Sequence, residues 1–402
     1  MKKVHLALVG CGGVARKRHI PAIALLRQAG IEICNVVACC DTVAQNAEQA
    51  AVDCRRLGLG NPRIYASWEE VIRDGIAEAI DVCLPHGLHH VVGIAALDAE
   101  LHVFMEKPFA VSIRTGRALA EAAERAGRVL AVGVPYRRAP GQRAVNWAIN
   151  EERLIGEPRL FFANYTQLRP PVANLTPAHL WRRDRVMGGG SGIIDSGFHF
   201  LDSVRYFLGE CEQVYAELRT SSPGRNAILT DRENIAVVVL SFANGVVGTW
   251  CWSFDVPGHE TRNIVFYGSE GSIEDTGYSH WLVIYKLFQG QGELRLRDGT
   301  YLGMEELLDR FRTAIGPDRL EQLFPGGVGE PFALELWDFF DAILNQRDPE
   351  VDGWDGLRTL ALADAIYESS LTRSAVRVED ILTGKVGSAW QADIDARWAS
   401  AP

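Results

Sequence analysis

The sequence predicts an α/β protein built from an N-terminal doubly wound parallel sheet and a C-terminal α+β part with a large, mostly antiparallel or mixed open sheet. Three observations support this prediction. Strand-like and helix-like segments alternate as far as residue 135, and strand-like segments with period-two patterns dominate the next stretch. A chain of 402 residues is also too long for one ordinary core. We therefore expect two domains, residues 1–135 and 136–402.

The first predicted elements are a strand, a glycine turn and a helix. An apolar run at residues 4–9 leads into Gly-Cys-Gly-Gly-Val-Ala at residues 10–15 and then into a helix-like segment at 16–28. Gly10 permits a tight turn, Gly12 leaves room for a pyrophosphate against bare backbone, and free N–H groups at the helix start face the phosphates. This pattern predicts a Rossmann dinucleotide-binding turn. Its expected cofactor contacts are Gly10, Gly12, Gly13, Val14 and Ala15.

Asp41 predicts the choice of cofactor. It follows a second apolar run at residues 33–40, which we expect to form the neighbouring strand. A carboxylate at this point accepts hydrogen bonds from the adenosine ribose hydroxyls and repels a 2′-phosphate. The sequence therefore favours NAD over NADP.

The alternation continues beyond Asp41 and predicts a parallel sheet covered by helices. Helices are expected at residues 43–57, 67–74, 89–99 and 113–127, and strands at 63–65, 80–84, 101–105 and 129–132. The character changes near residues 134–140. Beyond this point, strands are expected at 159–167, 213–220, 234–243, 246–254 and 264–267, and two late helices at 331–345 and 354–372.

Composition and charge exclude several classes of function. The net charge is −10 and no basic cluster stands out, so nucleic acid is not an expected partner. No apolar run approaches the roughly 20 residues that span a bilayer, so no membrane contact is expected. The eight cysteines are scattered without the spacing of metal ligands, which predicts free thiols, a cytoplasmic location and no metal site.

Lys107 is the first candidate catalytic residue. The sequence Glu106-Lys107-Pro108 follows the predicted strand at 101–105, and ligands of open α/β sheets bind outside the carboxyl ends of the strands. Pro108 restricts the backbone of Lys107, so that its ammonium group can be aimed at a substrate oxygen. An exposed lysine beside a turn is the alternative.

A second candidate cluster follows a glycine run at residues 188–192, which we expect to open a helix. Asp195 and His199 lie four residues apart and would share one face of that helix, where the carboxylate can orient the imidazole and support its protonated form. Asp202 would continue the same ridge. A zinc site needs a third ligand, which no nearby residue clearly supplies. A pair that only supports the helix is the alternative.

Together these segments resemble the Gfo/Idh/MocA family of NAD(P)-dependent oxidoreductases, which includes sugar and cyclitol dehydrogenases. The resemblance rests on the glycine turn, the Glu-Lys-Pro motif, the Asp-x-Gly-x-His motif at residues 195–199 and the segment Trp-Asp-Phe-Phe-Asp-Ala-Ile at 337–343. It implies that Lys107, Asp195 and His199 form the catalytic trio.

The resemblance also assigns residues to the cofactor and the substrate. Pro85 and His89 correspond to a proline and a histidine beside the nicotinamide, and His86 stands where the family often has asparagine. The expected cofactor contacts therefore also include Pro85, His86, His89, Glu106 and Lys107. The expected substrate contacts are Lys107, Tyr136, Arg137, Tyr165, Trp181, Arg182, Asp195 and His199, with His179 in the same segment.

The implied activity is hydride transfer between NAD and a ring secondary alcohol of a sugar, glycoside or inositol. His199 would take the hydroxyl proton, Lys107 would stabilise the developing oxyanion, and Asp195 would steady the imidazolium. Three alternatives remain open: reduction of a keto-sugar or imine, a redox-neutral reaction with recycled NAD, and a nucleotide-sensing regulatory protein. A large sheet face must be covered, so a homodimer or homotetramer is expected.

Overall fold

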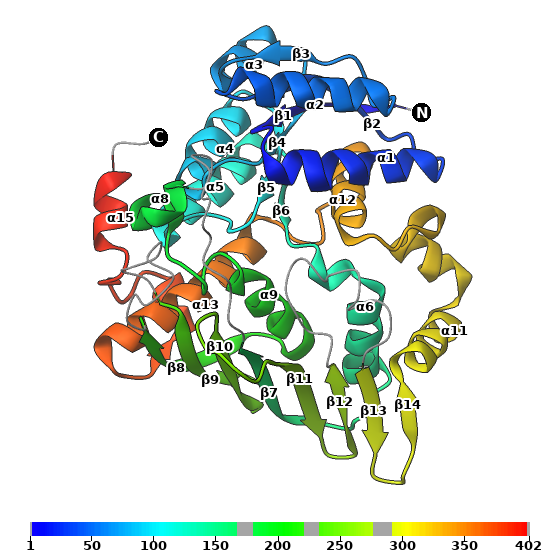
Figure 1. Ribbon diagram of the computed structural model, residues 1–402, viewed down its shortest axis with the longest axis vertical. Helices are drawn as coiled ribbons and strands as arrows, with labels where there is room; N and C mark the ends of the chain where they lie inside the picture. Colours follow the sequence, from blue (N-terminus) through cyan, green and yellow to red (C-terminus); the bar gives the residue numbers. More distant parts are fainter. Residues whose placement is uncertain (1, 167–179, 221–232, 276–291, 400–402) are drawn as a thin grey trace.

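Two sheets organise the chain, and the strands of each sheet come from separate stretches of sequence (Figure 1). The computed structural model describes residues 2–166, 180–220, 233–275 and 292–399. The first sheet is parallel, with six strands in the order β3-β2-β1-β4-β5-β6, so the predicted doubly wound sheet is confirmed. Its strands are β1 (Val4–Val9), β2 (Cys34–Cys40), β3 (Arg63–Tyr65), β4 (Ala79–Val82), β5 (His102–Glu106) and β6 (Leu130–Gly133).

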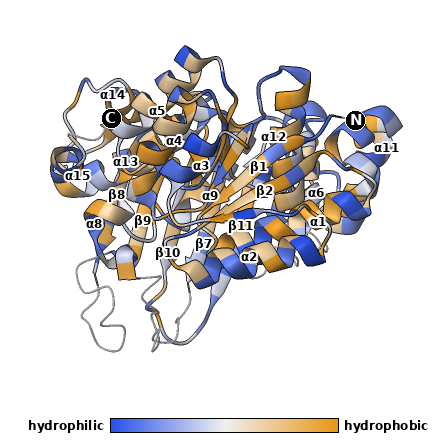
Figure 2. Ribbon diagram, turned by 90° about the horizontal axis from the view of Figure 1, so that it is seen from above, coloured by the Kyte–Doolittle hydropathy of each residue, from blue (hydrophilic) through white to orange (hydrophobic). Residues whose placement is uncertain are grey.

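The helices between these strands also follow the predicted alternation. The first one divides into a π-helical turn, η1 (Ala15–His19), and α1 (Ile20–Gln28). The others are α2 (Ala44–Arg56), α3 (Trp68–Asp74), α4 (His89–Asp98) and α5 (Ile113–Ala126). Ser67 and Ser112 cap α3 and α5, because each hydroxyl accepts a backbone N–H from the first helical turn. In Figure 2 the buried strands β1 and β2 are hydrophobic, whereas α2 mixes hydrophobic and hydrophilic residues.

The second sheet is mixed and has nine strands in the order β14-β13-β12-β11-β7-β10-β9-β8-β15. Only β7 and β10 pair in parallel among its described strands, so the predicted mostly antiparallel or mixed sheet is confirmed. Its strands are β7 (Pro158–Thr166), β8 (Cys211–Arg219), β9 (Ile235–Phe242), β10 (Val247–Ser253), β11 (Thr261–Gly268), β12 (Gly271–Asp275), β13 (Gly292–Leu296), β14 (Tyr301–Gly303) and β15 (Val376–Arg377).

The two faces of the second sheet differ in burial. In β9, Ala236, Val238 and Leu240 are buried, whereas Val237 and Val239 are 47 % and 40 % exposed. Helices α9 (Gly197–Leu208) and α13 (Gly353–Thr372) pack together, and α13 contacts β8. Apolar side chains are exposed on the opposite face of the second sheet. They include Phe162, Tyr215, Val237, Val239, Val247 and Tyr267.

Two late helices pack against the N-terminal part of the chain, and one of them also contacts the second sheet. Helix α12 (Pro331–Asn345) packs against α1 and against β1, β5 and β6, so a segment far along the chain covers the first sheet (Figure 1). Helix α13 contacts both α5 and β8. The sequence therefore returns to the first sheet after building most of the second.

Several elements lie outside the sequence-based expectations. They are α6 (Pro140–Asn146), the π-helical turn η4 (Trp147–Glu151), α11 (Met304–Leu323), α14 (Val378–Leu382), α15 (Ala392–Arg397) and the strands β12 to β15. Helix α11 contains the breaker pair Gly316-Pro317, and Gly316 adopts a non-helical conformation with φ 72°. Among the described residues, no helix combines the length and the hydropathy needed to cross a bilayer.

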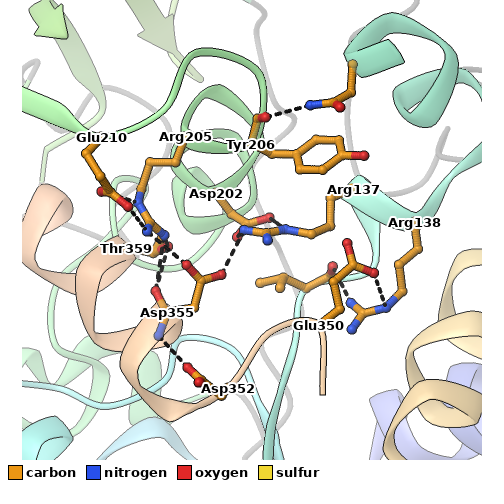
Figure 3. A network of polar contacts seen from close by, with 12 residues as sticks. Arg137, Arg138, Asp202, Arg205, Tyr206, Glu210, Glu350, Asp352, Asp355 and Thr359 are labelled. Carbon is orange, nitrogen blue, oxygen red and sulfur yellow. Dashed lines mark hydrogen bonds and ion pairs between the residues drawn. The ribbon is translucent and has the colours of Figure 1, made fainter. Parts of the chain in front are cut away.

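A buried ion network joins segments that lie far apart in the sequence (Figure 3). Arg137, in the turn η3 (Tyr136–Arg138), donates to Asp202 of α9 with an Nε–Oδ2 distance of 3.0 Å. Its guanidinium also lies 3.1 Å from Asp355 of α13, which bonds Arg205 of α9 at 2.9 Å. The side chains of Arg137 and Asp202 are 8 % and 1 % exposed. Because both charges are buried, each depends on the other.

Arg137→Met should therefore destabilise the fold. Removing one partner leaves Asp202 buried with an uncompensated charge, which costs about 3 to 5 kcal/mol. Urea unfolding followed by circular dichroism measures this loss, and adding Asp202→Leu should recover most of it. The matched control is Arg319→Met, which breaks an ion pair with Glu151 whose side chains are 46 % and 40 % exposed, and which should cost at most about 1 kcal/mol. Equal losses in the two single variants would contradict the prediction.

Candidate active site

The glycine turn between β1 and η1 has the shape that a dinucleotide phosphate requires. Gly10 has φ 91°, and a Cβ there would collide with the backbone carbonyl of Cys83. A Cβ on Gly12 or Gly13 would meet no other atom within 4 Å, so bare backbone faces open space at this point. Ala15 is fully buried, as close packing of the helical segment requires. These features fit a bound pyrophosphate.

Asp41 lies beside that turn, at the carboxyl end of β2. Its carboxylate accepts the backbone N–H groups of Cys11 at 2.9 Å and of Val43 at 2.8 Å. These bonds hold the carboxylate at the edge of the glycine turn, where the ribose of an adenosine would lie in a Rossmann fold. The residues present therefore fit the adenosine half of a dinucleotide.

The histidines after β4 join neighbouring loops. The ring of His89 lies 2.9 Å from the carbonyl oxygen of Pro108 and 3.0 Å from that of Leu84, so it ties together the ends of β5 and β4. His86 contacts the carbonyl oxygen of Gly188 at 2.9 Å and packs edge-on against Trp181. Burial lowers the pKa of both imidazoles, whereas the two carbonyl oxygens that face His89 act in the opposite direction on its pKa. The loop that begins at Pro85 is thus fixed against the glycine run.

Lys107 and Asp195 are in direct contact. The Lys107 ammonium donates to Asp195 Oδ1 at 2.8 Å and to the Asp195 carbonyl oxygen at 2.9 Å. Arg182 donates to the other carboxylate oxygen at 3.1 Å, and its guanidinium stacks on the ring of Trp181. Burial raises the pKa of Asp195, but the charges of Lys107 and Arg182 outweigh burial and hold that pKa well below its usual range. Asp195 is therefore an anion shared by two cations.

The expected placement of Asp195 and His199 on one helix is wrong. Helix α9 begins at Gly197, so Asp195 lies in the turn before it. The glycine run does not open the helix, because Gly189 and Gly190 adopt φ 79° and 159°, outside the helical range. The turn that holds Asp195 closes with a bond from the Gly197 N–H to the Gly192 carbonyl oxygen, five residues apart instead of the four of an α-helix. Asp202 belongs to α9 as expected, but its carboxylate contacts Arg137 rather than the candidate site.

His199 occupies the first turn of α9 and stacks on Tyr136, with ring centroids 4.3 Å apart and an interplanar angle of 8°. The residue is only 8 % exposed, and its Nδ1 has no hydrogen-bond partner in the described part of the chain. Burial and the charge of Lys107 hold the pKa of His199 well below its usual value, although Asp195 acts in the opposite direction. The imidazole is therefore neutral at neutral pH.

The remaining predicted substrate residues divide into two groups. Tyr165 is buried at the end of β7, and Trp181 and Arg182 lie beside Asp195. Arg137 does not fit the expected role, because its guanidinium belongs to the buried network with Asp202 and Asp355 (Figure 3). The predicted contact of His179 lies outside the described residues.

Glu106 does not fit its expected role as a cofactor contact, because its carboxylate contacts the backbone of Lys107 and the ring of His19. Its Oε2 accepts the backbone N–H of Lys107 at 3.0 Å, and its Oε1 lies 3.0 Å from His19 Nε2. The sequence reasoning missed His19 and its second partner Asp81, because both lie inside elements that looked like ordinary helix and strand. A charged residue in an otherwise apolar strand was the available signal for Asp81.

Comparison with known proteins shows the family to which the chain belongs. Residues 4–134 match the oxidoreductase family model described as an NAD-binding Rossmann fold, and residues 148–378 match the C-terminal alpha/beta domain of the same family. Levoglucosan dehydrogenase from Pseudarthrobacter phenanthrenivorans is 28 % identical, over 95 % of this chain and 100 % of the relative. Myo-inositol 2-dehydrogenase from Thermotoga maritima is 26 % identical, over 81 % of this chain and 86 % of that protein.

Solved structures share the fold. A levoglucosan dehydrogenase in complex with NADH and L-sorbose aligns with a TM-score of 0.76 and 25 % identity, over 94 % of this chain and 99 % of that one. An oxidoreductase from Thermotoga maritima aligns with a TM-score of 0.74 and 22 % identity, over 95 % and 100 % of the two chains. With both family models covering most of the sequence, the chain belongs to the Gfo/Idh/MocA family of NAD(P)-dependent oxidoreductases.

Proposed function

We propose that this protein is an NAD-dependent dehydrogenase that oxidises a ring secondary alcohol of a sugar, glycoside or inositol. The observation that carries the proposal is the contact between Lys107, which follows β5, and Asp195, with the buried His199 close enough for the charges of both to act on its pKa. The curated relatives named for levoglucosan and myo-inositol support this substrate class. The eight free cysteines support a cytoplasmic location, in a reducing compartment.

The charges at the site suit removal of a proton from an alcohol. NAD, when bound, supplies the acceptor for the hydride that leaves the alcohol carbon. His199 is neutral, so it can accept the hydroxyl proton without first losing one. An ammonium group has three donors, and two of those on Lys107 are directed to Asp195, which leaves one for the substrate oxygen. Oxidation thus converts the alcohol to a ketone, or to a lactone at an anomeric carbon.

The role of Asp195 is to hold Lys107, not to orient His199. Its two carboxylate oxygens contact Lys107 and Arg182, and its influence on His199 acts only through space. The negative charge of Asp195 also reduces the repulsion between the two cations Lys107 and Arg182. Arg182 and Trp181 would then contact the substrate from the same side.

Reduction of a keto-sugar is the second candidate function. A curated relative that is 27 % identical over 92 % of this chain and 98 % of its own length is a 1,5-anhydro-D-fructose reductase from Ensifer adhaerens. The same groups serve this direction if His199 donates the proton instead of accepting it. The neutral state of His199 favours oxidation at neutral pH.

We propose a homodimer or homotetramer that covers the exposed face of the second sheet. That face carries Val237, Val239 and Tyr215 on adjacent strands, and contiguous apolar surface of this kind is typical of interfaces between subunits. Light scattering coupled to gel filtration measures the mass directly. A monomeric mass at micromolar concentration would contradict the proposal.

Wild-type protein should form NADH when NAD is supplied together with at least one member of a panel of pyranoses, anhydrosugars and inositols. Absorbance near 340 nm follows the reaction. His199→Ala should lower kcat by roughly 10² to 10⁴-fold, because a positioned general base is lost, while NADH affinity measured by fluorescence stays close to that of wild type. Absence of turnover in both directions across the panel would sink the proposed function.

The preference for NAD should depend on Asp41. Asp41→Ser removes a negative charge that faces a 2′-phosphate, a clash worth about 1 to 3 kcal/mol. The ratio of kcat/KM for NAD over NADP should therefore fall by roughly tenfold to over a hundredfold. The control Asp98→Ser changes an exposed carboxylate at the end of α4 and should leave the ratio unchanged. A wild-type enzyme that prefers NADP would remove this role from Asp41.

The pKa of His199 should move in opposite directions in two variants. Asp195→Asn removes an anion that raises this pKa, so the pKa should fall further. Lys107→Met removes a cation that lowers it, so the pKa should rise. Because the rate requires the neutral imidazole, the acid limb of the wild-type kcat/KM profile should lie below about pH 6.5, the value for an ordinary histidine. NMR titration of the ring measures each pKa, and shifts of the same sign would contradict the charge assignment.

A further inference from the structure

His19 lies at the centre of a buried polar group that the proposed chemistry does not use. It is the last residue of η1, the π-helical turn that follows the glycine turn, and it is fully buried. Its Nδ1 lies 2.7 Å from Asp81 Oδ2 and its Nε2 lies 3.0 Å from Glu106 Oε1. The rings of Phe104 and Phe332 pack around it, with centroids 5.6 Å and 6.1 Å away. Both ring nitrogens therefore face carboxylates in an apolar surrounding.

This geometry specifies the charge of the ring. An ionised carboxylate only accepts hydrogen bonds, and a neutral imidazole carries one N–H, so two such bonds require the imidazolium. Burial lowers the pKa of His19, but Asp81 and the neighbouring groups outweigh burial and hold that pKa well above its usual value. Burial raises the pKa of Glu106, and the charge and hydrogen bond of His19 bring it below the usual range.

The titratable groups that face His19 come from three other elements. They are Asp81 at the end of β4 and Cys83 just after it, Glu106 of β5, and Glu330 and Glu335 at the start of α12. Burial raises the pKa of Glu335 well above its usual value, and that carboxyl is therefore neutral. Burial also raises the pKa of the Cys83 thiol, which stays protonated. Burial also raises the pKa of Glu330, and the carboxyl groups that bond the ring of His19 directly are those of Asp81 and Glu106.

The same atoms could suggest a metal site, since His19, Asp81 and Cys83 each bring one ligand-type atom within 4.8 Å of the others. The distance of 2.7 Å between His19 Nδ1 and Asp81 Oδ2 is that of a hydrogen bond. Two ligands of a tetrahedral zinc ion stand about 3.3 Å apart, given bonds of about 2.0 Å. The cluster is a hydrogen-bonded ion group.

The position of His19 links the glycine turn to Lys107. One carboxylate oxygen of Glu106 contacts His19, and the other accepts the backbone N–H of Lys107 at 3.0 Å. Asp81 fixes the other side of the ring from β4, the central neighbour of β1 and β5. A single ring therefore connects the segment that would hold the phosphates with the backbone that carries the catalytic ammonium.

We propose that His19 is a positioning residue, cationic throughout the working pH range, which fixes Lys107 against the glycine turn through Glu106. The inference rests on the proposed function of Lys107. The imidazolium holds the Glu106 carboxylate in one orientation, and that carboxylate holds the turn of Lys107. The glycine turn that would hold the cofactor phosphates and the backbone that directs the Lys107 ammonium group then form one rigid unit.

The kinetic test uses two conservative variants and one control. His19→Gln removes the cation, and Glu106→Gln keeps the shape but removes one of the two carboxylates. In both, kcat should fall on the order of 10²-fold, as expected when a reacting group is misplaced by about 1 Å, whereas the KM for the alcohol changes far less. His102→Gln alters a half-buried histidine at the opposite end of β5, where its ring accepts the N–H of Val129, and should leave kcat within about twofold of wild type.

The spectroscopic test does not depend on turnover. In protein labelled with ¹⁵N-histidine, the His19 signals, assigned with His19→Gln, should show both nitrogens protonated from about pH 6 to about pH 9, where an ordinary histidine loses its charge. Glu106→Gln should lower the pKa of this ring, and its signals serve for assignment if His19→Gln fails to fold. A neutral ring at about pH 8, or unchanged kcat in both variants, would overturn the proposal. Absence of any wild-type turnover would instead refute the proposed function, and the ring's protonation would still decide its charge.

Discussion

The contact between Lys107 and Asp195 is the interaction on which the site depends, because it joins the two parts of the chain. Lys107 follows β5 of the first sheet, and Asp195 precedes α9, which packs with α13 over the second. The two side chains are 17 % and 30 % exposed. A charge-assisted bond in such a partly buried place is strong only if the protein holds both groups in position. Glu106 holds Lys107 by accepting its backbone N–H, and Arg182 holds Asp195 by donating to its carboxylate.

Burial and partners, rather than residue type, determine the charge of each titratable group around this contact. His199 and His19 are both buried, and burial lowers the pKa of each. His199 has an unpaired Nδ1 in the described structure and Lys107 as its main charged neighbour, so it stays neutral and can act as a base. His19 faces carboxylates on both sides and stays charged. The fold thus lowers the pKa of one buried histidine and raises that of the other.

The sequence predicted the elements well where periodicity is local. The parallel strands and α12 needed only hydrophobic patterns of their own, and the glycine turn needed only its spacing. The site was harder to predict, because the four-residue spacing of Asp195 and His199 implies a shared face only inside a helix, and α9 begins after Asp195. Arg137 looked like a pocket residue because the pairing of its charge with Asp202 crosses 65 positions. No local pattern records such a pairing.

Packing against distant segments determines the conformation of the glycine run at residues 188–192 and therefore the position of Asp195. A Cβ on Gly192 would overlap the ring of Trp252 from β10, and one on Gly190 would overlap the hydroxyl of Tyr367 from α13. Trp390 then stacks on Tyr367 at 4.0 Å and donates from its indole to the carbonyl oxygen of Gly189. Three aromatic residues from distant segments therefore fix the backbone that leads to Asp195. These aromatic rings can approach the backbone because the glycines have no side chains. The glycines therefore act by steric fit to the second sheet and to the late segments. The orientation of the Asp195 carboxylate toward Lys107 follows from that fit.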